Sequence, residues 1–277
     1  MTREERARRD IIEVGRRLYD RGYVASNDGN ISIRLDEQRI LTTPTGVSKG
    51  FMTPDMLVVT DAGGKKLAGE RSASSELKMH LAVYQLRPDV NAVVHAHPPL
   101  ATAFAVAGIP LDRAVLAEVI CTLGSIPIAD YATPSTADLP AAISKYAKAH
   151  DGILMSNHGA LTSGADVMGA YYKMETIEHF AQISLVARLL GGERMLSREE
   201  VTRLQGLRDT YGIKSPAPIC EPCDARAQGD QVSCQVVHAP DVPGVKLVDA
   251  AAGGDAEIRL TYRELAALIA EAVRELA

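Results

Sequence analysis

Two histidines that lie two positions apart could bind one metal ion. His95 and His97 end the segment 89–97, which is rich in valine and lies between two prolines, and this pattern predicts a buried strand. Side chains alternate along a strand, so both imidazoles would project from the same face. A His-x-His pair on a strand is a common metal-binding geometry. Taken alone, the pair is equally well explained by two hydrogen-bonded core histidines.

A glutamate and a third histidine could complete the set of ligands. Glu76 lies in the first turn of a helix predicted over residues 75–86, where apolar side chains recur at helical spacing. His158 follows an apolar strand predicted over residues 152–155 and precedes Gly159, which favours a tight turn at the end of that strand. Three histidines and one glutamate are a donor set that suits zinc in a catalytic site.

Six short motifs resemble those of the class II aldolase/adducin family, and most closely those of its zinc-dependent L-fuculose-phosphate aldolases. In chain order they are Gly29-Asn30-Ile31-Ser32, Thr43-Pro44-Thr45-Gly46, Ser74-Ser75-Glu76, His95-Ala96-His97, Ile126-Pro127 followed by Tyr131, and Asn157-His158-Gly159. The resemblance covers roughly residues 8–213. It implies that Glu76, His95, His97 and His158 bind one Zn²⁺ ion, and that Glu76 also acts as the catalytic base.

The same resemblance implies that neutral groups bind the phosphate of a sugar-phosphate substrate. The residues that match are Gly29, Asn30, Thr45, Gly46, Ser74 and Ser75. A glycine-containing loop beside a hydroxyl can present backbone N–H groups to phosphate, and a helix N-terminus, as expected at Ser74 and Ser75, favours an anion. The simpler alternatives are an ordinary turn at Asn30 and helix capping by the two serines.

Aldol chemistry is the function that the resemblance implies. A ketose 1-phosphate of the fuculose or rhamnulose type would be cleaved to dihydroxyacetone phosphate and an aldehyde such as lactaldehyde. The related pentulose-phosphate 4-epimerases carry Asp at the position of Glu76, which favours the aldolase. The alternatives are that 4-epimerase, a sugar-phosphate decarboxylase or dehydratase on the same scaffold, and a non-catalytic adducin-like module.

Two further positions bear on proton transfer. Tyr211, in Thr210-Tyr211-Gly212, matches the C-terminal tyrosine of the family and is a second candidate catalytic residue. In fuculose-phosphate aldolases, another tyrosine from a neighbouring subunit helps protonate the departing aldehyde oxygen. Leu116 stands at that position by an ungapped count, so this role is unfilled.

The elements that would position these residues predict an α/β fold. We expect helices over residues 2–21, 75–86, 99–106, 136–148 and 165–190, strands over residues 30–35, 39–43, 89–97, 125–129 and 152–155, and a hairpin over residues 56–67. Strands set among helices indicate a mixed or antiparallel sheet that helices cover. The resemblance implies a three-layer α/β/α fold with a central mixed, mainly antiparallel sheet. It also implies a homotetramer with active sites at the subunit interfaces.

Two details of these helices can be checked directly. Thr2 and Glu5 have the spacing of a capping box, and Ser135 or Thr136 could cap the helix over residues 136–148. The longest helix, residues 165–190, is predicted to bury a broad apolar face. That face consists of Met168, Tyr172, Ile177, Phe180, Ile183, Val186 and Leu190.

Composition indicates a soluble enzyme. The 277 residues, 46% of them hydrophobic, suffice for one large core or a core with an appendage. A net charge of -5 and the lack of a long Lys/Arg run argue against nucleic acid as a partner. The N-terminus is charged, without an apolar signal segment, and no stretch approaches the length of a membrane span. We therefore expect a cytoplasmic protein without a membrane partner.

The chain changes character after residue 213. Residues 1–213 are expected to form the class II aldolase domain, residues 214–256 a linker with prolines and glycines, and residues 257–277 an amphipathic helix. This layout resembles the encapsulation peptides that target enzymes into bacterial microcompartments. The helix would then bind shell or cargo proteins in the microcompartment lumen. The alternative is that it packs on its own tetramer.

The cysteines fall into two groups. Cys121 is expected in the core. Cys220, Cys223 and Cys234, together with His238, have a spacing that could bind a second, structural zinc ion. The alternative is that these side chains lie together in a linker by chance.

Overall fold

The computed structural model describes residues 1–208, 210, 212 and 213. Its helices are α1 (Arg3–Asp20), α2 (Leu77–Leu86), α3 (Pro99–Val106), α4 (Ala117–Thr122), α5 (Asp138–Ala147), α6 (Val167–Leu189) and α7 (Arg198–Gly206), with short 3-10 helices η1 (Lys49–Phe51) and η2 (Pro54–Met56). Its strands are β1 (Asn30–Arg34), β2 (Arg39–Thr42), β3 (Val58–Asp61), β4 (Lys66–Ala68), β5 (Ala92–Ala96), β6 (Ile128–Ala129), β7 (Gly152–Met155) and β8 (Gly159–Gly164). The predicted linker and terminal helix lie outside the described residues.

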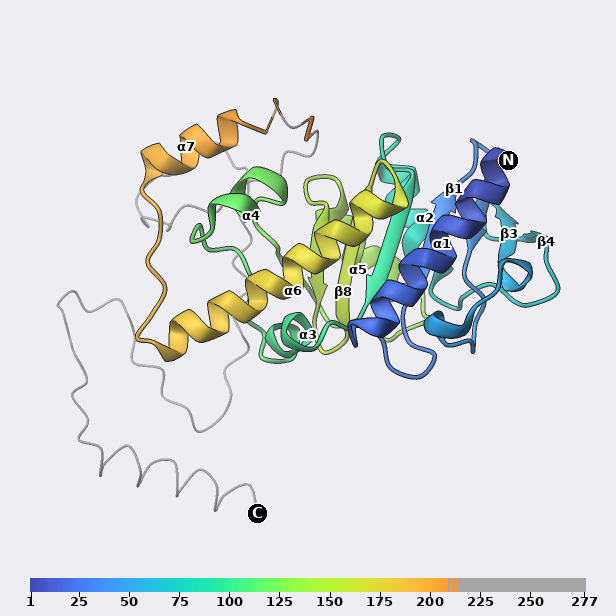
Figure 1. Cartoon of the computed structure of the whole chain (residues 1–277), viewed down its shortest axis with the longest axis horizontal. Helices are drawn as coiled ribbons and strands as arrows, with labels where there is room; N and C mark the ends of the chain where they lie inside the picture. The colour runs from blue at the N-terminus through green and yellow to red at the C-terminus, as the bar shows by residue number, and fades with distance from the viewer. Residues whose placement is uncertain (209, 211, 214–277) are drawn as a thin grey trace, which may run out of the picture. The chain divides into compact units, whose positions relative to one another are not determined.

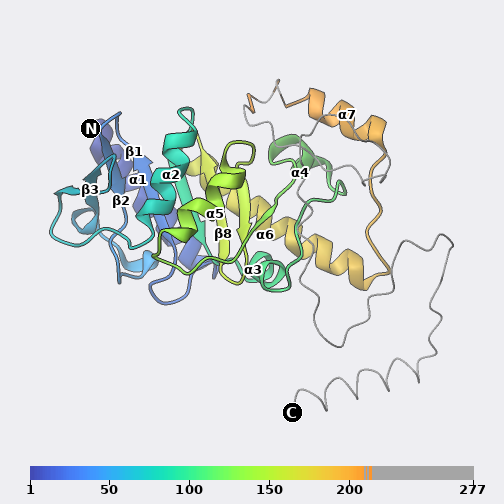
Figure 2. The same ribbon diagram turned by 180° about the vertical axis from the view of Figure 1, so that it is seen from behind.

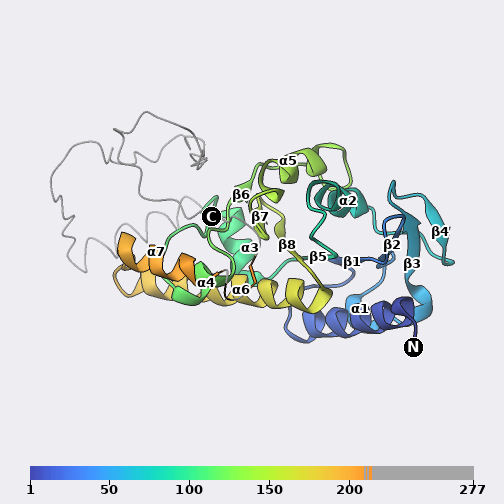
Figure 3. The ribbon, with the colours of Figure 1, turned by 90° about the horizontal axis from the view of Figure 1, so that it is seen from above.

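The strands form one sheet in the order β4-β3-β2-β1-β5-β8-β7-β6; β8, β1, β3 and β4 are labelled in Figure 1 and all strands in Figure 3. Neighbouring strands are antiparallel except for β6 and β7, which are parallel. The predicted mixed, mainly antiparallel sheet is therefore confirmed. Strand β5 lies at its centre between β1 and β8, so His95 is delivered to the middle of the sheet.

Helices cover both faces of the sheet, as Figure 3 shows from above. On one face the core contains buried side chains of α1, α3 and α6 together with Ala92, Val94 and Ala96 of β5. On the other face Val93 of β5 packs with α2 and α5, which Figure 2 shows in front of the strands. Side chains of β5 thus alternate between two hydrophobic cores, one on each face of the sheet, and His95 projects from the face that α2 covers. This arrangement confirms the three-layer α/β/α fold.

Helix α1 has the predicted capping box. The Thr2 hydroxyl accepts a hydrogen bond from the Glu5 N–H over 3.1 Å, and the Glu5 carboxylate accepts one from the Thr2 N–H over 2.7 Å. These bonds satisfy two N–H groups that a helix start would otherwise leave without partners. The helix then buries Ile11, Val14 and Leu18 against the sheet.

Several sequence predictions were wrong in detail. Strand β8 and helices α4 and α7 were not predicted. The N-cap of α5 is Ala137, so neither Ser135 nor Thr136 occupies that position. The strand predicted over residues 89–97 is shorter than expected, since β5 ends at Ala96 and His97 follows it.

The buried face of α6 also differs from the predicted one. Tyr172, Val186 and Leu190 are exposed. The buried positions instead follow helical spacing and include small and polar side chains: Val167, Ala170, Tyr171, Met174, Ile177, Glu178, Phe180, Ala181 and Ser184. The prediction gathered the large apolar residues regardless of their angle around the helix axis, whereas only one stripe faces the sheet. Among the described helices, none combines the length and the hydropathy needed to cross a bilayer.

Candidate active site

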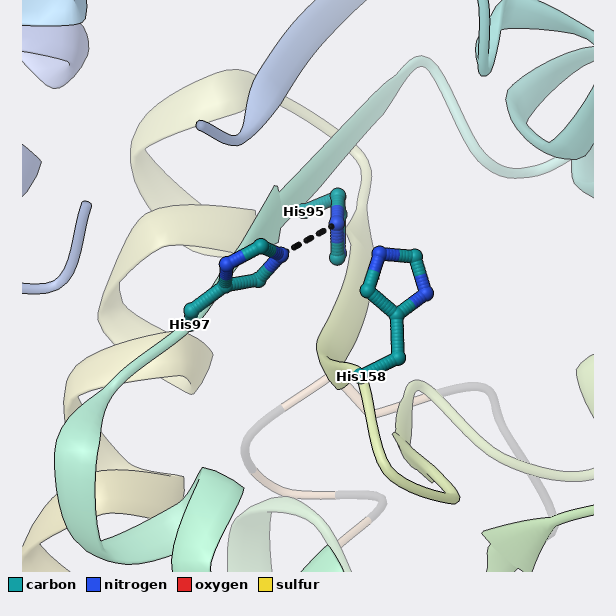
Figure 4. A group of neighbouring side chains, drawn as sticks. All are labelled: His95, His97 and His158. Atoms are coloured by element: carbon teal, nitrogen blue, oxygen red, sulfur yellow. Dashed lines mark hydrogen bonds between the residues drawn. The ribbon is translucent and has the colours of Figure 1, made fainter. Parts of the chain in front are cut away.

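Three imidazoles point toward one another beside the end of β5 (Figure 4). His95 belongs to β5, His97 follows that strand, and His158 lies in the turn between β7 and β8. One nitrogen from each ring lies within 4.8 Å of the others, and the Nε2 atoms of His95 and His97 are 3.1 Å apart. The predicted turn at His158 is confirmed by its N–H, which donates to the Met155 carbonyl over 3.0 Å.

The hydrogen bonds behind two of these rings assign their tautomers. His95 Nδ1 lies 2.9 Å from the Ala160 carbonyl oxygen, which can only accept, so Nδ1 carries the proton. His97 Nδ1 lies 3.4 Å from the Asp28 carboxylate, which favours the same tautomer. Both Nε2 atoms therefore direct lone pairs toward the centre of the cluster. A backbone carbonyl or carboxylate behind a histidine is the usual support for a metal-binding imidazole.

Burial favours the neutral form of His95 and His158. It lowers the pKa of fully buried His95 well below its ordinary value, and the neighbouring His97 and His158 lower it further. Burial also lowers the pKa of His158, although the Glu76 carboxylate opposes that shift. Neutral imidazole is the form that binds a metal ion.

Glu76 supplies a carboxylate to the same cluster. Its Oε1 lies 3.3 Å from His158 Nε2, and its Oε2 lies 3.5 Å from His95 Nε2. Glu76 occupies the N-cap of α2 rather than the predicted first turn. Tetrahedral zinc with Zn–N bonds of about 2.0–2.1 Å needs donor atoms roughly 3.3 Å apart. The distances of 3.1 Å between His95 and His97, 3.3 Å between His158 and Glu76 and 3.5 Å between His95 and Glu76 fit such an ion. The four predicted ligand residues are thus brought together.

Asn30 connects this cluster to β1. Its Nδ2 donates to Glu76 Oε2 over 2.8 Å, whereas its Oδ1 is buried without a partner among the described residues. The preceding Gly29 has a φ of +72°, and a Cβ there would lie 2.8 Å from the His95 carbonyl oxygen. Only glycine allows the loop to approach the histidine strand this closely.

The other candidate phosphate-binding residues lie on two loops that are hydrogen-bonded to each other. The Thr45 N–H donates to the Ser72 carbonyl, and the Ser74 N–H donates to the Thr43 carbonyl, each over 3.1 Å. Gly46 is thereby placed beside the serines that precede α2.

Backbone donors are available at these loops. Within the described residues, the N–H groups of Gly46 and Ser75 have no protein acceptor. Both residues are exposed, so the two groups remain accessible to a ligand. The Ser74 hydroxyl accepts from the Glu76 N–H over 3.3 Å, but the N-cap of α2 is Glu76 and no side chain makes a capping hydrogen bond there, so the capping considered as an alternative is not found.

Some sequence candidates lie elsewhere. Tyr211, Cys220, Cys223, Cys234 and His238 are outside the described residues. Leu116 is the N-cap of α4 and packs against the core, and Cys121 is buried as expected.

Two charged residues near the site were missed by the sequence reasoning. Asp28 could have been found, because a carboxylate stands two positions before Asn30 in a polar turn. Lys49 carries no such signal, since a lysine next to glycine usually indicates a solvated loop.

The fold and this cluster of three histidines and a glutamate define a class II aldolase, a lyase. The chain belongs to the family described as class II aldolase and adducin N-terminal domain, whose model matches residues 9–185.

Curated relatives and solved structures agree with that family. An L-fuculose phosphate aldolase of Methanococcus maripaludis is 37% identical over 177 residues, which cover 64% of this chain and 95% of the relative. A 3-oxo-tetronate 4-phosphate decarboxylase of Pectobacterium atrosepticum is 29% identical over 74% of this chain and 94% of the relative. A solved L-fuculose 1-phosphate aldolase superposes with a TM-score of 0.69 at 30% identity and covers 74% of this chain and 96% of that structure.

Proposed function

We propose that this protein is a zinc-dependent aldolase that cleaves a ketose 1-phosphate of the fuculose or rhamnulose type. The products are dihydroxyacetone phosphate and an aldehyde such as lactaldehyde. The observation that carries the proposal is the convergence of His95, His97 and His158 on the Glu76 carboxylate. The names of relatives at 37% and 30% identity support the choice of substrate class.

In this proposal the three histidines and Glu76 bind Zn²⁺ through the atoms that already face one another. Bound zinc would supply a Lewis acid for the negative charge that develops on the substrate oxygens. Glu76 would exchange the proton at the carbon next to the carbonyl: it returns the proton after cleavage and removes it for condensation. Its carboxylate oxygen lies 3.5 Å from His95 Nε2, so this base would lie beside the bound metal ion.

The substrate phosphate would bind on the loops before α2. Gly29, Asn30, Thr45, Gly46, Ser74 and Ser75 are the proposed phosphate-binding residues. The N–H groups of Gly46 and Ser75, which have no acceptor in the described part of the chain, support this assignment. Backbone N–H groups at a helix start attract phosphate without any side-chain charge.

Three parts of the proposal rest on the sequence alone. Tyr211 is proposed as a second catalytic residue, and the active enzyme is proposed to be a homotetramer. We further propose that the terminal helix directs a cytoplasmic enzyme into a bacterial microcompartment. That location would suit an enzyme that releases a reactive aldehyde.

A decarboxylase of sugar phosphates is the second candidate. The observation that favours it is the 29% identity to a protein named 3-oxo-tetronate 4-phosphate decarboxylase over 74% of the chain. Both reactions break a bond next to a carbonyl, so the same metal and phosphate sites would serve either of them.

The test combines metal analysis with two assays on the purified full-length protein. Elemental analysis should find zinc, with one ion per chain for the histidine site. A second ion, lost in a Cys220/Cys223 double mutant, would indicate the additional cysteine site. Dihydroxyacetone phosphate offered with a panel of short aldehydes should give carbon–carbon bond formation. Release of carbon dioxide from a 3-oxo-tetronate 4-phosphate, without any aldol product, would instead establish the decarboxylase.

A further inference from the structure

Lys49 is a buried cation close to the candidate active site. The residue is 2% exposed, and its ammonium donates to the Asn27 carbonyl over 2.8 Å and to the Val47 carbonyl over 2.7 Å. Burial lowers the pKa of this ammonium to about 8, and the carboxylates of Asp28 and Glu76 oppose the shift. The side chain therefore keeps its charge at neutral pH. A buried charge is costly, and its retention needs an explanation.

Packing of α1 fixes the backbone of Lys49. A Cβ on Gly15 would lie only 2.8 Å from the Lys49 carbonyl oxygen, so the absence of a side chain there lets η1 approach α1 closely. One turn further along α1, the ring of Tyr19 meets that of Phe51 in η1 edge to face with centroids 5.2 Å apart. These contacts with α1 hold the backbone of Lys49 in place.

The two acceptors of Lys49 belong to different loops of the candidate phosphate site. Asn27 precedes Gly29 and Asn30, and Val47 follows Thr45 and Gly46. The ammonium therefore connects these loops through their carbonyl groups. A carbonyl oxygen turned toward a phosphate would repel it, and one bonded to Lys49 is held facing the ammonium. The buried ammonium is thus held between the segments that carry Asn30 and Gly46, and in a medium of low dielectric constant its charge would attract an anion bound to those segments.

We propose that Lys49 is a positioning residue for the phosphate of the substrate. It connects the loop of Asn30 to the loop of Gly46 and provides the fixed positive charge of the phosphate subsite. The proposal rests on the proposed function, because it needs a phosphorylated substrate. It adds to that function a cation that does not touch the substrate.

The test compares the wild-type protein with Lys49→Met, Lys49→Gln and Lys49→Arg. The control is Lys148→Met, the same change at an exposed lysine at the end of α5. Affinity for inorganic phosphate is measured by calorimetry with metal-loaded and metal-free protein, beside kcat, KM, zinc content and thermal unfolding. The measurement on metal-free protein distinguishes phosphate that binds to the loops from phosphate that binds to zinc.

Lys49→Met should weaken phosphate binding and raise KM at least about tenfold, because a fixed charge and two loop contacts are lost. Zinc content should stay the same, and kcat should change by less than about threefold. Lys49→Gln, which keeps a donor without the charge, should also bind phosphate weakly, and it tests the charge should the Met variant not fold. Lys49→Arg should restore much of the affinity, and Lys148→Met should behave as wild type.

Three results would overturn the inference in distinguishable ways. Suppose that wild type binds phosphate and that folded Lys49→Met and Lys49→Gln show the same phosphate affinity and KM as wild type. This result would exclude Lys49 as a positioning residue for the phosphate, but it would not contradict the proposed function. Equal loss of zinc, kcat and stability, with KM unchanged, would show a merely structural role. Failure of the wild type itself to bind phosphate would remove the phosphate subsite, and with it both this inference and the substrate class.

Discussion

The side-chain amide of Asn30 donates a hydrogen bond to Oε2 of Glu76 over 2.8 Å. The sequence assigned Asn30 to the substrate phosphate, but this bond gives it contact with the proposed base as well. Because the amide can only donate through its nitrogen, it holds one carboxylate oxygen on the side of β1. The other oxygen of Glu76 faces His158. The orientation of the proposed base therefore depends on a residue of the proposed phosphate-binding loop.

Removal of this bond should affect catalysis more than metal binding. A hydrogen bond to a charged group contributes about 1.5–3 kcal/mol, so Asn30→Ala should lower kcat by roughly ten- to a hundredfold. Three histidines remain, and zinc content should stay near the wild-type value. Steady-state kinetics and elemental analysis of the same preparation check both statements. An Asn30→Ala enzyme with normal kcat would show that the bond does not orient the base.

Two substitutions should separate metal binding from proton transfer. His95→Ala should lose both zinc and activity, since it removes a fully buried donor from the centre of the cluster. Glu76→Gln should keep much of the zinc on the three histidines but lose proton transfer, with kcat at least about a hundredfold lower. Zinc retained after dialysis and aldol cleavage are measured for each variant.

The control for these variants is His179→Ala, which removes an exposed histidine of α6. It should match wild type in both zinc content and activity. Near-normal cleavage by Glu76→Gln would contradict the assignment of Glu76 as the base.

Acid should destabilise the fold through His80. This side chain is fully buried, its Nδ1 lies 2.7 Å from the Ser32 hydroxyl, and burial lowers its pKa from 6.5 to about 3. Below pH 6.5 His80 takes up a proton in the unfolded chain, whereas in the folded chain it stays neutral until about pH 3. The stability contribution is therefore complete above pH 6.5 and is lost as the pH falls toward 3.

The expected loss from His80 alone is about 1.4 kcal/mol between pH 7.5 and pH 5.5. Urea unfolding at both pH values, at one protein concentration and without metal, measures it. Other buried histidines act in the same direction, so the informative quantity is the difference between wild type and His80→Gln. The difference in free energy of unfolding between wild type and His80→Gln should be about 1.4 kcal/mol less favourable to wild type at pH 5.5 than at pH 7.5. A difference in free energy of unfolding that does not change with pH would show that the pKa of His80 is not lowered in the folded protein.

The ligand set was predictable from local patterns together with the six motifs that resemble those of the family. Alternation along β5 and a turn after β7 place His95 and His158, and a helix start places Glu76. Strand β8 was missed because Gly159–Gly164 consists, apart from Leu161, of small and polar residues whose burial comes from neighbours on both sides.

Contacts between distant segments were not predictable from the residues themselves. The Asn30–Glu76 bond joins positions 46 residues apart. Lys49 was missed for the same reason, because its burial results from the packing of η1 on α1. No local pattern distinguishes such a lysine from a solvated one.

The terminal helix predicted over residues 257–277 should be unnecessary for catalysis. Its sequence places Leu265, Ile269 and Val273 on one side, and an isolated helix of this length is marginal in water, so the apolar stripe should need a partner. A truncated protein of residues 1–213 keeps Tyr211 and every described site residue, and it should retain kcat and KM within about twofold of the full chain.

Residues 255–277 fused to a fluorescent protein should give foci in cells that express microcompartments. A matched fusion with Leu265, Ile269 and Val273 changed to Ser should remain diffuse. Diffuse fluorescence from the unaltered fusion, or loss of activity in the truncated protein, would count against a targeting role and favour packing of the tail on its own tetramer.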